Sequence, residues 1–236
     1  MRVKAVFVTG IDTGVGKTVV CGLLARYLSD KGYRVITQKW VQTGSAGFPK
    51  DIDIHLRLMG KSRRQISDYL SYAAPYSFKF ASSPHLAARL EKKRINPARI
   101  KSSFRLLSKE FDFVIVEGIG GALVPLDEKM LVIDMAEELN LPVLIVAKNR
   151  LGAINHTLLT IEAVRARHMK ILGIIFNSSY RNENKVILND NPKIIRALTD
   201  EAVLGNLSWL KDRESLYSKF VPIGQRILAG LKRTAE

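Results

Sequence analysis

A glycine-rich loop between a predicted strand and a predicted helix constrains the fold of this chain more than any other feature. The strand covers residues 3–9, the loop reads Gly10-Ile-Asp-Thr-Gly-Val-Gly-Lys-Thr18, and an apolar-periodic helix follows over residues 19–30. Backbone N–H groups of such a loop, together with the helix N-terminus, can surround phosphate oxygens. We therefore expect Lys17 to reach the β- and γ-phosphates of a nucleotide, and the Thr18 hydroxyl to bind Mg²⁺.

Apolar strands alternate with helices along the rest of the chain. Further strands are predicted over residues 34–38, 112–117, 142–147, 171–176 and 203–207. Helices are predicted over residues 53–59, 83–94, 96–110 and 155–169, after Asn191-Pro192, and at the C-terminus. Apolar strands separated by helices are typical of a parallel sheet covered on both faces. The pattern predicts an α/β fold of the P-loop NTPase type in one domain, residues 1–236, with ligands bound beyond the carboxyl ends of the strands.

Acidic residues near two strand ends are candidate ligands for Mg²⁺. In nucleotide sites this ion takes one or two carboxylates besides phosphate and water oxygens. Glu117 ends an apolar strand, where an unpaired buried carboxylate would be costly, so it is the first candidate. Asp53, placed by the loop after the second strand, is the next candidate. Asp51 could substitute for Asp53, although a role as a helix cap explains Asp51 equally well. The predicted metal ligands are thus Thr18, Asp53 and Glu117.

The formal net charge of +15 would suit a polyanionic partner. The basic residues are dispersed in separate segments without interleaved aromatic residues, so solvated helix faces and a phosphate site explain them better than specific nucleic-acid binding. No apolar run is long enough to span a bilayer, and the N-terminus has no secretion signal. Together with the single Cys21, these features predict a cytoplasmic protein whose partners include neither a membrane nor a specific nucleic acid.

Six short motifs together resemble those of dethiobiotin synthetases. They occur in the family's order at residues 7–18, 38–44, 83–85, 116–121, 151–156 and 176–177. The motif around Lys39 and the Leu-Gly-x-Ile-Asn-His motif are the specific ones. Five residues separate Gly10 from Gly16, one more than in the usual P-loop, and this spacing is also what the family shows.

The resemblance implies an ATP- and Mg²⁺-dependent ligase of biotin biosynthesis, a homodimer with active sites at the subunit interface. Its substrates would be 7,8-diaminononanoate, CO2 and ATP, and its product dethiobiotin. The reaction would pass through a carbamate and a carbamic–phosphoric anhydride before the urea ring closes. Such chemistry needs cations over the carbamate and the γ-phosphate more than it needs a covalent nucleophile.

The expected residue roles combine side-chain chemistry with this resemblance. The catalytic candidates are Lys39, Lys17 and Thr13. The substrate-binding candidates are Thr43 and, for the partner subunit's site, Gly152, Ala153, Ile154 and Asn155, where a helix N-terminus suits a carboxylate. The nucleotide-binding candidates are Gly14, Val15, Gly16, Lys17, Thr18, Val19, Asp53, Glu117, Gly118, Ile119, Gly120 and Asn177. The amide of Asn177 is expected to read the edges of adenine.

Partitioning and septum-positioning ATPases, which act on DNA or membranes, have the same fold and are the alternative interpretation. Their phosphate loop carries a lysine where this chain has Asp12, five positions before Lys17, and this difference argues against them. Departures from the family pattern at Gly14 and Asn206 leave the preference among ATP, CTP and GTP open.

Overall fold

The computed structural model describes residues 4–178, 184–208, 210 and 212–233. Within these residues, six parallel strands form a central sheet in the order β2-β5-β1-β6-β7-β8. Their bounds are β1 Lys4–Gly10, β2 Val35–Lys39, β5 Phe113–Gly121, β6 Val143–Lys148, β7 Ile171–Ser178 and β8 Val203–Ser208. A second, small sheet pairs β3 (Val41–Gln42) with β4 (Tyr76–Ser77), also in parallel.

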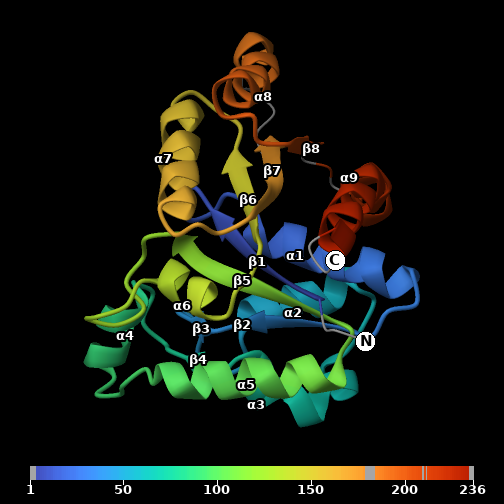
Figure 1. Ribbon diagram of the computed structural model, residues 1–236. Coiled ribbons are helices and arrows are strands. Elements are labelled where there is room, and N and C mark those ends of the chain that lie inside the picture. Colours follow the sequence, from blue (N-terminus) through green and yellow to red (C-terminus); the bar gives the residue numbers. More distant parts are fainter. Residues whose placement is uncertain (1–3, 179–183, 209, 211, 234–236) are drawn as a thin grey trace.

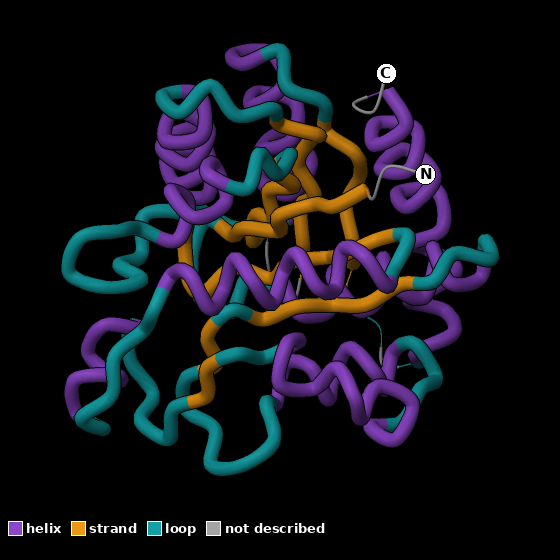
Figure 2. Tube along the Cα trace, turned by 60° about the horizontal axis from the view of Figure 1, so that its bottom comes forward, coloured by secondary structure: helices purple, strands orange, loops and turns teal. Residues whose placement is uncertain are grey.

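Helices cover both faces of the central sheet (Figure 1). The helices are α1 Lys17–Asp30, α2 Lys50–Leu58, the 3-10 helix η1 Arg63–Tyr69, α3 Leu70–Ala73, α4 Pro84–Leu90, α5 Pro97–Glu110, α6 Val132–Glu138, α7 Ala153–Arg165, α8 Lys185–Thr199 and α9 Arg213–Arg233. Side chains of α1 and α9 form the core on one face, and those of α5, α6 and α7 contribute to the core on the other. Figure 2 shows the strands running between the helical layers. The expected α/β fold with a parallel sheet is thereby confirmed.

The strands alternate their side chains between two separate hydrophobic cores. On β1, Phe7 packs into the core beneath α5 to α7, whereas Val6 and Val8 pack against α1 and α9. On β5, Val114 packs into the same core as Phe7, and Ile115 packs into the same core as Val6 and Val8. Because successive strand side chains point to opposite faces, a strand buried on both faces must be apolar throughout. This requirement explains the unbroken apolar runs in the sequence.

The helix predicted to begin at Asn191-Pro192 begins seven residues earlier, and this boundary was wrong. Helix α8 starts at Lys185, after Asn184, whose side chain accepts a hydrogen bond from the Val186 backbone N–H. Pro192 lies inside the helix and leaves the carbonyl of Leu188 without its helical donor.

The side chain of Asn149 supplies the missing donor. Its Nδ2 lies 2.8 Å from the Leu188 oxygen, and its Oδ1 accepts from Asn191 at 2.8 Å. The loop after β6 therefore satisfies the helix at its proline, which no local pattern around Pro192 could indicate.

Two smaller differences concern a predicted helix and a segment for which no element was predicted. The helix expected over residues 83–94 ends at Leu90, because Lys92 takes a left-handed conformation with φ of 52°. The segment over residues 61–80 contains η1, α3 and β4, three short elements without a clear period. Among the described residues, no helix has the length and apolar character needed to cross a membrane.

Candidate active site

The glycine-rich loop connects β1 to the N-terminus of α1, as expected. Gly16 forms the N-cap of α1 with φ of 103°, a left-handed conformation that residues with a Cβ rarely adopt. A Cβ at this position would also lie 2.1 Å from Nδ2 of Asn177, which approaches from β7. Asn177 in turn donates a hydrogen bond of 2.8 Å to the Val15 carbonyl. Gly16 is therefore required both by the turn and by the side chain behind it.

Lys17 is held beneath the loop by two backbone carbonyls. Its Nζ donates to the oxygens of Asp12 at 2.9 Å and of Gly120 at 2.6 Å. Burial, together with the nearby ammonium of Lys39, lowers the pKa of Lys17 to about 8. An anion beside this side chain would favour its charged form, so the position suits a phosphate group.

Lys39, at the carboxyl end of β2, lies opposite Glu117 in the middle of β5, which continues four residues beyond the predicted strand end at residue 117. The parallel register pairs the two residues directly, and Lys39 Nζ lies 2.8 Å from Glu117 Oε1. The same ammonium contacts Asp51 Oδ2 at 2.7 Å and the Gly118 oxygen at 2.9 Å. Although burial lowers the pKa of Lys39, the carboxylates of Glu117 and Asp51 outweigh it and raise that pKa above the ordinary value. Lys39 is thus a buried ammonium that its two carboxylate partners keep charged near neutral pH.

Glu117 is buried yet ionised, because its two oxygens have separate partners. Oε1 accepts hydrogen bonds from Thr18 Oγ1 at 2.9 Å and from Lys39. Oε2 lies 2.8 Å from Nε2 of His55, which belongs to α2. Burial raises the pKa of Glu117, but the charge of Lys39 and the hydrogen bond from His55 outweigh it and hold this pKa well below its usual range.

A cavity beside the phosphate loop is lined by three side chains with oxygen atoms, those of Thr18, Asp51 and Glu117. Thr18 contacts Glu117 directly, and a single ammonium, that of Lys39, touches both carboxylates. A hydroxyl and two carboxylates beside a phosphate loop are the hard oxygen donors that Mg²⁺ prefers. These residues fit the expected ion.

Of the two aspartates considered for the metal, Asp51 lines the cavity and the expected Asp53 does not, so Asp51 is the better candidate. Asp53 lies outside the pocket, where its Oδ1 accepts from Arg63 at 2.9 Å and Oδ2 lies 3.7 Å from Arg57. The hydrogen bond with Arg63 is the main reason that the pKa of Asp53 is lowered. On a helix, residues two apart point in different directions, so only one of these aspartates can face the strand ends.

The predicted residues mostly line one cavity of about 800 Å³. Its expected lining residues are Thr13, Gly14, Gly16, Lys17, Thr18, Val19, Lys39, Thr43, Glu117, Ile119 and Gly120. Residues that our prediction did not assign to the site, besides Asp51, are Val41, Gln42, Ala81, Ser82, Ser83 and Val124. The sequence therefore indicated the phosphate end of the cavity better than its other wall, which comes from short elements around β3 and β4.

Several expected residues do not line this cavity, among them Val15 and Gly118, which are buried. Residues 152–155 begin α7, where Gly152 and Asn155 are exposed and Ala153 is buried. Their expected role in a partner subunit's site stays a prediction. Asn177 contacts the back of the phosphate loop through Val15, and its adenine contact likewise stays a prediction.

His55 was missed by the sequence interpretation, although a signal for it existed. Asp51 and His55 are four residues apart on α2 and therefore share one face of that helix. That face meets Lys39 through Asp51 and Glu117 through His55. A helix beginning at Lys50, three residues before the predicted start, makes this pairing apparent.

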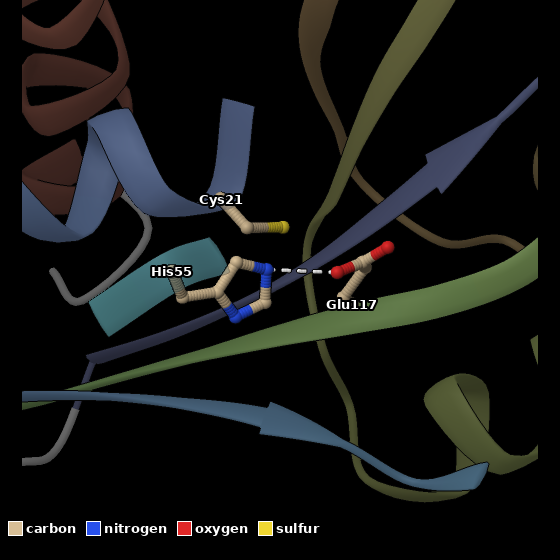
Figure 3. Close-up of side chains that lie close together, drawn as sticks. All are labelled: Cys21, His55 and Glu117. Carbon is tan, nitrogen blue, oxygen red and sulfur yellow. Dashed lines mark hydrogen bonds and ion pairs between the residues drawn. The ribbon is translucent and has the colours of Figure 1, made fainter. Parts of the chain in front are cut away.

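Figure 3 shows Cys21 of α1 beside His55 and Glu117, with ligand atoms of the three within 4.8 Å of one another. A metal centre would need the Cys21 thiolate, since the thiolate is the form that binds metals. Burial raises the pKa of the Cys21 thiol well above its ordinary value. We therefore interpret the group as a hydrogen-bonded support for Glu117 rather than a thiolate metal site.

Comparison with known proteins places these residues in a family. A family model described as "AAA domain" matches residues 4–215. An ATP-dependent dethiobiotin synthetase of Chlorobaculum tepidum is 40% identical over 198 residues, covering 84% of this chain and 82% of the relative. One from Haemophilus influenzae is 39% identical over 174 residues, covering 74% of this chain and 91% of the relative. The chain belongs to the dethiobiotin synthetase family.

Two solved structures are similar in fold to this member of the dethiobiotin synthetase family, at lower sequence identity. A plasmid partition protein from Borrelia burgdorferi has a TM-score of 0.62 at 16% identity, covering 97% of this chain and 99% of its own. The cobyrinic acid a,c-diamide synthase from Mycobacterium smegmatis has a TM-score of 0.55 at 16% identity, covering 93% and 92%. These likenesses concern the fold alone.

Proposed function

We propose that this chain is an ATP-dependent dethiobiotin synthetase, which converts 7,8-diaminononanoate, CO2 and ATP into dethiobiotin, ADP and phosphate. The observation that supports this most directly is the buried ammonium of Lys39 at the base of the phosphate-loop cavity, in a chain of this family. A carbamate and a γ-phosphate are both anionic, so the reaction needs fixed positive charge between them.

The proposed reaction proceeds in three steps. One amine of the diamine adds to CO2 and releases a proton, giving a carbamate. A carbamate oxygen then attacks the γ-phosphorus of ATP, and ADP leaves as the carbamic–phosphoric anhydride forms. The second amine attacks the carbonyl carbon, the C–O bond to phosphate breaks, and the five-membered urea ring closes with release of a proton.

The roles of the chain's residues follow from their positions. Lys17, below the loop, binds phosphate oxygens, and Lys39 stabilises charge on the carbamate and on the transferring phosphoryl group. Thr13 and Thr43 line the same cavity, which supports a role for their hydroxyls as hydrogen-bond donors to the reactants. Thr18, with Asp51 and Glu117, would hold Mg²⁺, which would neutralise charge on the phosphate oxygens. None of these steps requires a covalent nucleophile from the protein.

We further propose that the active protein is a homodimer. Leu123, Leu151 and Leu159 are exposed by 53%, 77% and 60%, although they are large and apolar. They lie near the start of α7, where Gly152 and Asn155 are expected to reach the substrate carboxylate of the partner subunit. An apolar surface next to an incomplete substrate site favours a second copy of the chain as its cover.

The decisive experiment measures phosphate release and dethiobiotin formation by the purified protein with Mg-ATP. We expect both to require diamine and bicarbonate together, and to change little when DNA or anionic vesicles are added at about physiological salt, where surface charges are screened beyond roughly 8 Å. Stimulation of phosphate release by DNA or vesicles, without dependence on the diamine, would instead support an ATPase switch.

The Lys39→Ala variant supplies the residue-level check. Nucleotide affinity should stay near that of the wild type, while product formation falls by about 100-fold or more, because a preorganised charge on the transition state is lost. Lys109→Ala, at an exposed position on α5, is the matched control and should keep full activity. Equal activity of the two variants would contradict the role of Lys39.

A further inference from the structure

Glu117 has one oxygen that faces the cavity and one that faces away from it. Oε1 is shared by Thr18 and Lys39, both of which line the cavity. Oε2 points to the opposite side, toward His55, which does not line the cavity and is fully buried. The proposed reaction involves Oε1 through Thr18 and Lys39, whereas it gives no role to the contact between Oε2 and His55.

The direction of this hydrogen bond follows from the chemistry of its partners. An ionised carboxylate only accepts hydrogen bonds, so Nε2 of His55 must carry the proton that it donates to Oε2. Nδ1 of His55 is buried and has no hydrogen-bond partner.

His55 is held firmly in this position by close packing. Helices α1 and α2 approach closely at Gly22, where an added Cβ would lie 3.2 Å from Cα of His55 and 2.6 Å from Cδ1 of Leu58. Cys21, the neighbour of Gly22 on α1, lies beside the imidazole ring (Figure 3). Because α2 is fixed against α1, the imidazole has little freedom to move away from Glu117.

We propose that His55 is a positioning residue that fixes the rotation of the Glu117 carboxylate, so that Oε1 is presented to the cavity. This role of His55 rests on the proposed function in one respect, namely that the ligand bound next to Glu117 is Mg-ATP. Removing a residue that hydrogen-bonds to a metal-ligating side chain typically lowers metal affinity or activity by about 10- to 100-fold.

The test compares His55→Leu with His55→Gln. Leucine fills the space without a donor, whereas the amide nitrogen of glutamine can reach the position of Nε2 and donate to Oε2. The measured quantity is the affinity for a non-hydrolysable ATP analogue with and without Mg²⁺, together with the Mg²⁺ concentration for half-maximal turnover. Circular dichroism and thermal unfolding report whether each variant folds.

We expect the affinity of His55→Leu for the analogue in the presence of Mg²⁺ to fall by about tenfold or more. Its affinity for the analogue without Mg²⁺ should stay unchanged. We expect His55→Gln to recover most of the loss measured with Mg²⁺. The proposal would be overturned if both variants lost Mg²⁺-dependent affinity equally, or if the loss of affinity followed the loss of thermal stability alone. Either result would show that His55 has a merely structural role. An unchanged Mg²⁺ dependence in His55→Leu would also overturn the proposal.

One further control addresses the neighbouring thiol. If the purified protein carried a stoichiometric transition metal that Cys21→Ser lost, His55 would be a metal ligand and the proposal would be wrong. Analogue binding does not require turnover, so an absence of dethiobiotin formation would contradict the proposed function while leaving the test of His55 intact.

Discussion

The buried carboxylate of Glu117 meets three side chains, and their arrangement explains why an acid is tolerated at this depth. Removing an ionised carboxylate from water is costly unless charges and hydrogen bonds compensate it. Lys39 supplies the charge, and Thr18 and His55 supply hydrogen bonds on the two oxygens. The cluster therefore keeps two opposite charges available on buried side chains, where charges interact more strongly than in water.

At the residue scale, the two aspartates of α2 give a matched pair of variants. We expect Asp51→Asn to lower Mg²⁺-dependent turnover by about tenfold or more, a loss of at least roughly 1.4 kcal/mol in transition-state stabilisation. Asp53→Asn removes the same charge two residues away and should change turnover little, because Asp53 pairs with Arg63 outside the cavity. Steady-state kinetics over a Mg²⁺ titration checks both. The opposite order of effects would restore Asp53 as the metal ligand.

The pKa of Lys17, about 8, predicts a pH dependence for nucleotide binding. A bound phosphate favours the charged form of Lys17. Above pH 8, Lys17 must therefore gain a proton when ATP binds, whereas below pH 8 most of Lys17 is already protonated. The dissociation constant for ATP in EDTA should therefore rise as the pH increases beyond 8, by up to about tenfold per pH unit. Titration calorimetry from pH 7 to 9 measures this. Lys17→Arg, which stays charged throughout, is the control and should show a flat profile over the same range.

At the scale of elements, α2 links the phosphate loop to the end of β2 and to the middle of β5. Its Asp51 reaches Lys39 at the end of β2, and its His55 reaches Glu117 on β5. The helix itself packs on α1, which begins at Lys17 in the phosphate loop. The geometry of the charged cluster therefore depends on how closely α1 and α2 approach each other.

Gly22→Ala tests that dependence. Alanine favours a helix over glycine by about 1 kcal/mol, but the new Cβ would lie 2.6 Å from Leu58 Cδ1 and 3.2 Å from His55 Cα. Overpacking costs about 1–3 kcal/mol, so we expect net destabilisation in urea unfolding and reduced activity. The same substitution in a Leu58→Ala background should be less destabilising. Additive effects in this double-mutant cycle would contradict a clash at Leu58.

At the scale of the whole molecule, the exposed leucines near α7 predict how two copies meet. Leu159→Asp should convert a dimer into a monomer in sedimentation experiments and should abolish most product formation, because a charge would be buried in an apolar interface. Leu198→Asp, equally exposed at 60% but on α8, is the matched control and should stay dimeric and active. A dimeric, active Leu159→Asp protein would show that the subunits meet elsewhere.

Local pattern determined the parallel α/β fold and the phosphate loop, and it indicated Glu117 as a site residue, since apolar periodicity and glycine requirements are local properties. Lys39 was indicated by the motifs that resemble those of dethiobiotin synthetases. The tertiary structure decided what distant segments contribute. The choice of Asp51 over Asp53 depended on how α2 faces the strand ends, and the role of His55 depended on its contact with a residue 62 positions away. The continuity of α8 through Pro192 depended on Asn149 from another loop. Contacts between distant segments depend on packing and register, which no local pattern specifies.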